Sequence, residues 1–260
     1  MVKHYENRFF ILGLCMISFL FAAQYSFAGD LCSNKAQLEK LLRQQKIIGS
    51  FDSNYLSCKS LPQSPELSLV AYTKWIASKE DEIIGVYQLT FLTLETKTNT
   101  VQSKYVVQQS LISDAISLDS ISLDLGAYKV SQTVRAIGLR LNYSGHSQPN
   151  PYRMQLLNLY DLNNKTMILD GLIVERYRAE TDTQCNAEIE ERNSTLVMLP
   201  KKSHQYFDIQ VRSKISHYEM SGTLEHCVEG KRNRAQQSFI LKFDGTQYQV
   251  PQAFAEDYRY

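Results

Sequence analysis

The 260-residue sequence lacks an excess of charge of either sign. It holds 28 lysines and arginines against 27 aspartates and glutamates, a formal charge of +1 at pH 7. Such a balance provides no broad field to attract nucleic acid or an acidic membrane surface, so we expect no nucleic-acid partner. Hydrophobic residues make up 43% and charged residues 21%, which argues against intrinsic disorder.

The familiar catalytic motifs are also missing. The sequence has no G-x-S-x-G nucleophile elbow, no H-E-x-x-H zinc helix, no P-loop and no dinucleotide-binding fingerprint. His146 and Ser147 follow a glycine as in a nucleophile elbow, but the second glycine is absent and the stretch to Pro151 is rich in turn formers. We therefore expect a loop there and no cofactor, and the absence of catalytic motifs favours a non-enzymatic protein without deciding the question.

Histidines and charged clusters give only weak signals. His217 falls on the apolar side of a predicted strand, which favours a buried, hydrogen-bonded histidine over a metal ligand, and we expect no metal site. The acidic cluster at Glu188, Glu190 and Glu191 and the basic run 231–234 are typical of solvated loops.

The one long apolar run lies at the N-terminus and predicts a secretory signal peptide over residues 1–28. Lys3 and Arg8 precede fifteen apolar residues, 9–23, and Ser26 and Ala28 stand at the −3 and −1 positions of a cleavage site. A membrane-spanning helix would need about 18 or more apolar residues. We expect cleavage before Gly29, no membrane anchor afterwards, and an exported protein.

Export changes the interpretation of the cysteines. Beyond Cys15 in the leader, the chain has Cys32, Cys58, Cys185 and Cys227, an even number that predicts two disulfides in an oxidising compartment. Of the three possible connectivities we favour Cys32–Cys58 and Cys185–Cys227, because each closes a moderate loop in a separate region. Each bridge would contribute about 3–4 kcal/mol by restricting the unfolded chain.

One helix is predicted, over residues 34–49. Asn34 is a capping residue, apolar side chains recur from Leu38 near helical spacing, and Gly49 is placed to end the helix. The stretch from Leu61 to Pro65 then breaks regular structure and marks a junction.

After this junction the hydrophobic pattern changes to the period of two that indicates strands. The clearest is 206–218, in which Ile209 and Val211 alternate with polar residues such as Asp208. Asp244-Gly245 and the stretch 163–165 predict hairpin turns. The remaining predicted strands are residues 67–76, 83–96, 101–109, 134–143, 154–162, 166–174, 238–243 and 246–250.

These elements predict a mainly β protein. We expect an antiparallel sandwich or a propeller-like stack of sheets with a short N-terminal helical cap. The predicted organisation is a signal peptide at 1–28, a disulfide-bonded helical cap at 29–65 and an antiparallel β domain at 66–260.

Three stretches carry a resemblance, namely residues 134–160, 169–175 and 182–185. They resemble a group of uncharacterised exported proteins of Gram-negative bacteria, over most of residues 56–250. The resemblance implies a β-rich fold and a periplasmic location. It implies no activity.

Three functions are compatible with these observations. The first is a non-enzymatic periplasmic protein that binds an envelope protein or polymer through a sheet face or loops, with His146, Ser147, Asn150 and Tyr152 as the candidate binding loop. The second is a hydrolase of envelope carbohydrate or peptide, which requires two converging carboxylates. The third is an inhibitor or immunity protein that inserts the loop 144–151 into an envelope-targeting enzyme.

Mass spectrometry of the exported protein tests the predicted processing and pairing together. We expect a chain that begins at Gly29 and gains the mass of four hydrogens on reduction. Free thiols at Cys185 and Cys227 before reduction would contradict the pairing.

Overall fold

The computed structural model describes residues 31–47, 55–76 and 85–260. The predicted signal peptide and Gly49 lie outside these ranges. Within them the protein is mainly β, as predicted, and its strands are all paired antiparallel.

In the described ranges, four helical segments flank the strands. They are η1 (Leu31–Ser33) and α1 (Lys35–Gln44) near the N-terminus, and η3 (Gln252–Phe254) and α2 (Ala255–Tyr258) near the C-terminus. The strands are β1 (Leu56–Leu61), β2 (Ser64–Ile76), β3 (Gly85–Glu95), β4 (Val101–Ser113), β5 (Ile116–Asp124), β6 (Ile137–Gly145), β7 (Tyr152–Asp161), β8 (Thr166–Thr181), β9 (Ala187–Ser203), β10 (Tyr206–Thr223), β11 (His226–Glu229), β12 (Asn233–Phe243) and β13 (Tyr248–Gln249).

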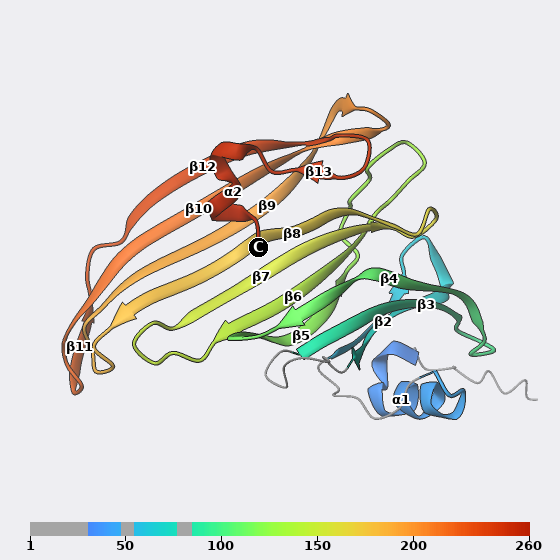
Figure 1. The fold of residues 1–260 in the computed structure, drawn as a ribbon, viewed down its shortest axis with the longest axis horizontal. Coiled ribbons are helices and arrows are strands. Elements are labelled where there is room, and N and C mark those ends of the chain that lie inside the picture. Colours follow the sequence, from blue (N-terminus) through green and yellow to red (C-terminus); the bar gives the residue numbers. More distant parts are fainter. Residues whose placement is uncertain (1–30, 48–54, 77–84) are drawn as a thin grey trace, which may run out of the picture.

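The strands form two sheets with a simple up-and-down order. The small sheet runs β1-β2-β3-β4 and the large sheet runs β13-β12-β10-β9-β8-β7-β6-β5, with β11 paired to β10 beyond β12. Most neighbours in each sheet are consecutive in sequence, so short turns make the connections. Figure 1 shows the small sheet and α1 at one end of the long strands of the large sheet.

A shared apolar core holds the two sheets together. Side chains of β2 to β4, including Leu69 and Phe91, pack in one cluster with side chains of β5 to β8, including Leu141, Leu156 and Tyr160. The ring of Phe91 meets the ring of Tyr160 at 4.8 Å between centroids, edge to face. Successive residues of a strand point to opposite faces of its sheet, so Leu69 of β2 enters this core while Val70 does not.

The other face of the small sheet is covered by α1. Leu38 and Leu42 of the helix are buried against Val70 and Leu92. Asn34 caps the helix as predicted, because its Oδ1 accepts a hydrogen bond from Gln37 N at 3.0 Å.

The helix ends earlier than predicted, at Gln44. Lys46 adopts a left-handed conformation with φ 55°, and Ile47 N donates to Leu42 O at 2.9 Å. A lysine therefore takes the C-terminal position that the sequence analysis assigned to Gly49.

The large sheet forks between β8 and β9. These strands pair only from Glu175 and Asn193 toward the β8–β9 turn. Beyond that point Arg259 and Tyr260 take the place of β9 beside β8, with an isolated bridge between Leu172 and Arg259 and a hydrogen bond from Tyr260 N to Gly171 O. A second core forms around the fork, where Tyr258 packs with apolar side chains of β7, β8, β10 and β12.

Several strands were not predicted, and one residue changes face. β1, β5, β9 and β11 were missed because their alternation is broken by polar or mixed residues, and β1 lies in the region assigned to the helical cap. Asp208 was expected on the wet face of its strand, but it is 1% exposed. The β9–β10 register shifts between Phe207 and Ile209, which turns Asp208 inward.

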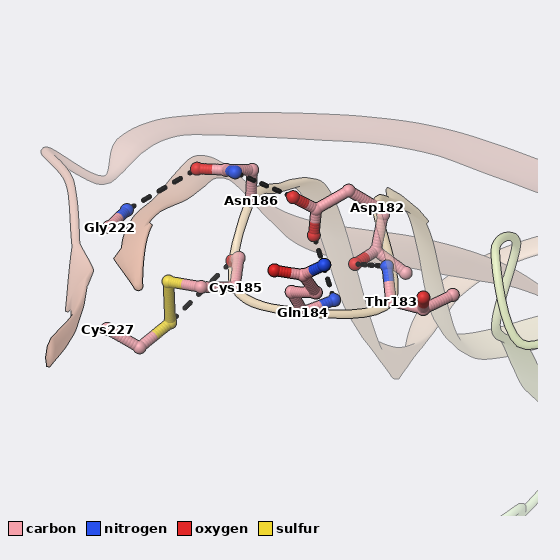
Figure 2. The surroundings of a disulfide bond; sticks show 8 residues. Asp182, Thr183, Gln184, Cys185, Asn186, Gly222 and Cys227 are labelled. Atoms are coloured by element: carbon pink, nitrogen blue, oxygen red, sulfur yellow. Dashed lines mark hydrogen bonds between the residues drawn. A yellow bond between two sulfur atoms is a disulfide. The ribbon is translucent and has the colours of Figure 1, made fainter. Parts of the chain in front are cut away.

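Both predicted disulfides are present. Cys32 pairs with Cys58 and Cys185 with Cys227, with Cα–Cα distances of 5.0 and 5.6 Å. Figure 2 shows the second bridge, which joins the β8–β9 turn to β11. Asp182 orders this turn by accepting hydrogen bonds from Gln184 N at 2.9 Å and Asn186 Nδ2 at 2.6 Å. In the described ranges no helix is long and apolar enough to cross a membrane.

The covering role of α1 can be tested at Leu42, which is fully buried. We expect Leu42→Ala to lower the free energy of unfolding by about 2–5 kcal/mol, because it leaves a cavity against the small sheet. Lys40→Ala on the exposed side of the helix is the control. Equal urea midpoints for the two variants would show that α1 contributes no packing.

Candidate functional site

A groove with a volume of about 780 Å³ lies on the large sheet. Its floor is a single row of residues that face one another across five adjacent strands. In register they are Tyr152 of β7, Arg178 of β8, Glu190 of β9, His217 of β10 and Asn233 of β12. At one end of this row Tyr152 packs against the core that the two sheets share.

Glu190 is the central charge of this floor. Its side chain is 8% exposed, and its two oxygens take different partners: Arg176 Nη2 at 2.7 Å from Oε1 and Arg178 Nη2 at 2.8 Å from Oε2. His217 Nε2 lies 3.8 Å from Oε2. Burial alone would raise the pKa of Glu190, but the two arginines outweigh it and hold the pKa below its usual value. Glu190 is therefore ionised at neutral pH.

Next to the groove, two arginines stand directly opposite each other. Arg176 of β8 pairs in register with Arg192 of β9, and their side chains are only 6% and 3% exposed. Like charges in this position repel, and burying each costs on the order of several kcal/mol. Asp257 of α2 compensates, since its Oδ1 lies 3.1 Å from Arg176 Nη2 and 3.4 Å from Arg192 Nη2.

A second row of the groove is acidic. Glu180, Glu188 and Glu219 face one another across β8, β9 and β10, and all three are exposed. Carboxylates directly opposite one another destabilise a sheet, so this row does not serve the fold. Lys231 is the one cation that lines the groove besides Arg178 in the described part of the chain.

The candidate loop from the sequence analysis is divided by the structure. Asn150 and Tyr152 line the groove, together with Pro151. His146 instead shares a hydrogen bond with Ser117 Oγ at 2.8 Å, and Ser147 Oγ accepts one from Asn150 N at 3.2 Å. The loop therefore contributes its second half to the groove, while its first half holds the turn.

The prediction for His217 was wrong. Its side chain is 54% exposed rather than buried, although it lies on the same side of β10 as Ile215. The reason is that the apolar face of β10 ends at Ile215, and the next position on that face opens into the groove opposite Glu190.

The expectation of solvated charge clusters was also wrong in part. Glu190 is buried, and Arg232 from the basic run binds Glu191 Oε2 at 2.9 Å while its guanidinium lies 3.8 Å from the ring centroid of Tyr218. Arg232 lies in the connection between β11 and β12, while Glu190, Glu191 and Tyr218 are on β9 and β10. Arg176, Arg178 and Arg192 drew no attention in the sequence, because only the β8–β9 register brings them together with Glu190.

The chemistry of the groove is that of polar recognition. Its walls offer carboxylates, two cations, a histidine, amides and the ring of Tyr152. Most of these side chains are on strands of one sheet, while Lys231 and Asn150 are on the connections next to them. Among the described residues, no group of three or more histidine, cysteine, aspartate or glutamate side chains could hold a metal ion. Side chains fixed on paired strands keep their positions better than side chains on loops.

The charge cluster predicts how stability depends on pH. The pKa values of Glu190 and Asp257 are both lowered, because arginine contacts outweigh the effect of burial. Since an unfolded carboxyl has a pKa of about 4, the unfolded chain binds more protons in this range, and this stabilisation is lost as the pH falls below about 5.

Melting temperatures measured from pH 7 to pH 3 should show this. We expect Glu190→Gln to melt well below the unsubstituted protein at pH 7, with a difference that narrows toward pH 3. Glu188→Gln on the same strand is the matched control and should melt no lower than the unsubstituted protein at pH 7, because it relieves the repulsion within the acidic row. A Glu190→Gln difference that stays constant with pH would contradict the assignment.

Comparison of the chain with protein-family models, with curated proteins and with solved structures finds no match.

Proposed function

We propose that this chain is an exported, periplasmic, non-enzymatic protein that binds a segment of an envelope partner in the groove on the large sheet. The observation that carries the proposal is the five-strand row from Tyr152 to Asn233, a polar floor under an open volume of about 780 Å³. An open polar groove on a rigid sheet suits an extended polypeptide better than a small apolar ligand, which prefers an enclosed apolar pocket.

The charge of the groove favours a basic segment. Arg178 is 55% exposed, but its guanidinium is engaged by the buried Glu190. The exposed carboxylates of Glu180, Glu188 and Glu219 therefore outnumber the two cations that line the groove, Arg178 and Lys231. Complementary charge of this kind directs encounter and excludes acidic partners.

The β10–β11 hairpin, which carries Cys227, offers exposed apolar side chains near the groove strands. Leu224 is 72% exposed and Val228 is 62% exposed. The bridge between Cys185 and Cys227 fixes this hairpin to the β8–β9 turn.

Carboxylate chemistry is less well supported by the same groove. A hydrolase requires one carboxyl with a raised pKa beside one that stays ionised. Glu190 has a lowered pKa, and the other three glutamates are exposed in an open groove that does not exclude water. The inhibitor alternative shares the same surface, because Asn150 and Pro151 of the loop 144–151 line it.

Export and the periplasmic location rest on the sequence of residues 1–28 and on the resemblance to exported proteins. The two disulfides support an oxidising compartment. The scaffold is best regarded as an open sandwich, since the small sheet covers only one end of the large one.

A basic probe peptide tests the groove. We expect fluorescently labelled decalysine to bind the folded protein at low salt and decaglutamate not to bind. Glu188→Gln/Glu219→Gln should weaken decalysine binding by at least about fivefold, because two exposed charge contacts are lost. Titration followed by fluorescence anisotropy measures both peptides.

The matched control is Glu66→Gln/Glu175→Gln, which removes the same charge from exposed positions outside the groove. Equal weakening in this control would mean that only net charge attracts the peptide, and the proposed groove would be wrong.

A further inference from the structure

A segment of the chain itself occupies the fork between β8 and β9. Residues 252–260 form η3, the short helix α2 and an isolated bridge, and the C-terminal end lies beside β8 (Figure 1). A four-residue helix has no stability of its own. The segment therefore keeps its position through the contacts that the fork makes with it.

The fork holds Asp257 with a pair of arginines. Arg192 Nη1 and Arg176 Nη1 donate to the backbone carbonyl of Asp257 at 2.9 and 3.3 Å, while their Nη2 atoms contact the carboxylate. The Nε atoms of both arginines are buried without a hydrogen-bond partner among the described residues. A guanidinium pair that contacts both a carboxylate and a carbonyl recognises an acidic residue within a peptide.

Beside the arginine pair is a pocket for an aromatic ring. Tyr258 is fully buried, with its ring 4.7 Å from the ring of Phe239 and 4.4 Å from the guanidinium carbon of Arg192. Its hydroxyl donates to Gln237 Oε1 at 2.8 Å. An apolar pocket with one polar contact at its end distinguishes tyrosine from phenylalanine and from smaller residues.

The backbone after the tyrosine is bound as well. Arg259 bridges Leu172, and Tyr260 N donates to Gly171 O at 3.2 Å. Gly171 has φ 61°, and a Cβ at this position would come within 3.2 Å of Tyr260 O. Glycine at position 171 thus lets the bound backbone approach β8 closely.

We infer that the fork is a peptide-recognition site for an acidic residue followed by tyrosine, and that Asp257 and Tyr258 occupy it in cis. Without Asp257 the buried arginines would share Glu190, which Arg178 already engages, so an empty fork requires an anion. A partner protein that carries an acidic-tyrosine pair satisfies the same contacts and displaces the segment. Glu190 belongs to both the fork and the groove, but the inference stands without the proposed function of the groove.

The test is trans binding of a labelled peptide with the sequence of residues 252–260, QAFAEDYRY. In the unsubstituted protein the tethered segment competes at an effective concentration of about millimolar, so micromolar peptide should not bind. In the full chain with Asp257→Ala/Tyr258→Ala the fork is vacated, and we expect micromolar binding. Glu256→Ala changes an exposed neighbour on α2 and should behave like the unsubstituted chain.

Peptide variants define the recognition. Asp257→Asn or Tyr258→Ala in the peptide should each weaken binding to the vacated fork by at least about tenfold, which corresponds to 1.4 kcal/mol. Arg192→Lys in the vacated chain should do the same, since lysine cannot make the bidentate contact. Folded protein, judged by near-ultraviolet circular dichroism, that fails to bind the peptide or binds both variants equally would overturn the inference.

Hydrogen exchange provides a measurement that needs no substitution. Millimolar peptide added to the unsubstituted chain should speed exchange of the amides in residues 252–260, because the segment is displaced. This measurement decides the question if the Asp257→Ala/Tyr258→Ala chain does not fold. Exchange of the amides in residues 252–260 that stays unchanged on addition of the peptide would then overturn the inference. Concentration-dependent dimers that the peptide dissociates would support the site and identify a second copy as the source of the segment.

Discussion

The buried arginine pair at Arg176 and Arg192 is the constraint on which this end of the molecule depends. Two guanidinium groups in register across a ladder are stable only with counter-charges placed around them. Glu190 supplies one from the same sheet and Asp257 another from the C-terminal segment. The position of α2, the fork in the sheet and the ionised floor of the groove all follow from this requirement.

The rest of the fold explains why such a cluster can be tolerated. Most strands pair with sequence neighbours, and two separate apolar cores hold the sheets and the C-terminal segment. The two disulfides secure the elements with the least core, namely η1 before α1 and the β10–β11 hairpin. A scaffold stabilised in this way tolerates the repulsive row of Glu180, Glu188 and Glu219.

Local signals in the sequence predicted local structure well. The cap at Asn34 and the disulfide partners are confirmed, because each depends on a few neighbouring residues or on a small number of pairings. The hairpin at Asp244-Gly245 is also present, but four residues rather than two connect its strands, since Phe243 pairs with Tyr248. The site was predicted only through Asn150 and Tyr152, which follow a turn-rich stretch that ends where β7 begins. The remaining floor residues are polar positions in strands, and polar positions alone do not indicate whether a strand face is open or covered.

The sequence by itself determined the β class, the antiparallel hairpins and the cysteine framework, since hydrophobic period and turn chemistry act over short distances. Only the tertiary structure decided which charges meet. Arg178 and Glu190 are neighbours because β8 and β9 pair in one register, and a shift of one residue would turn each side chain to the other face. His217 is exposed because the apolar face of β10 ends at Ile215, and Asp208 is buried because the β9–β10 register shifts beside it.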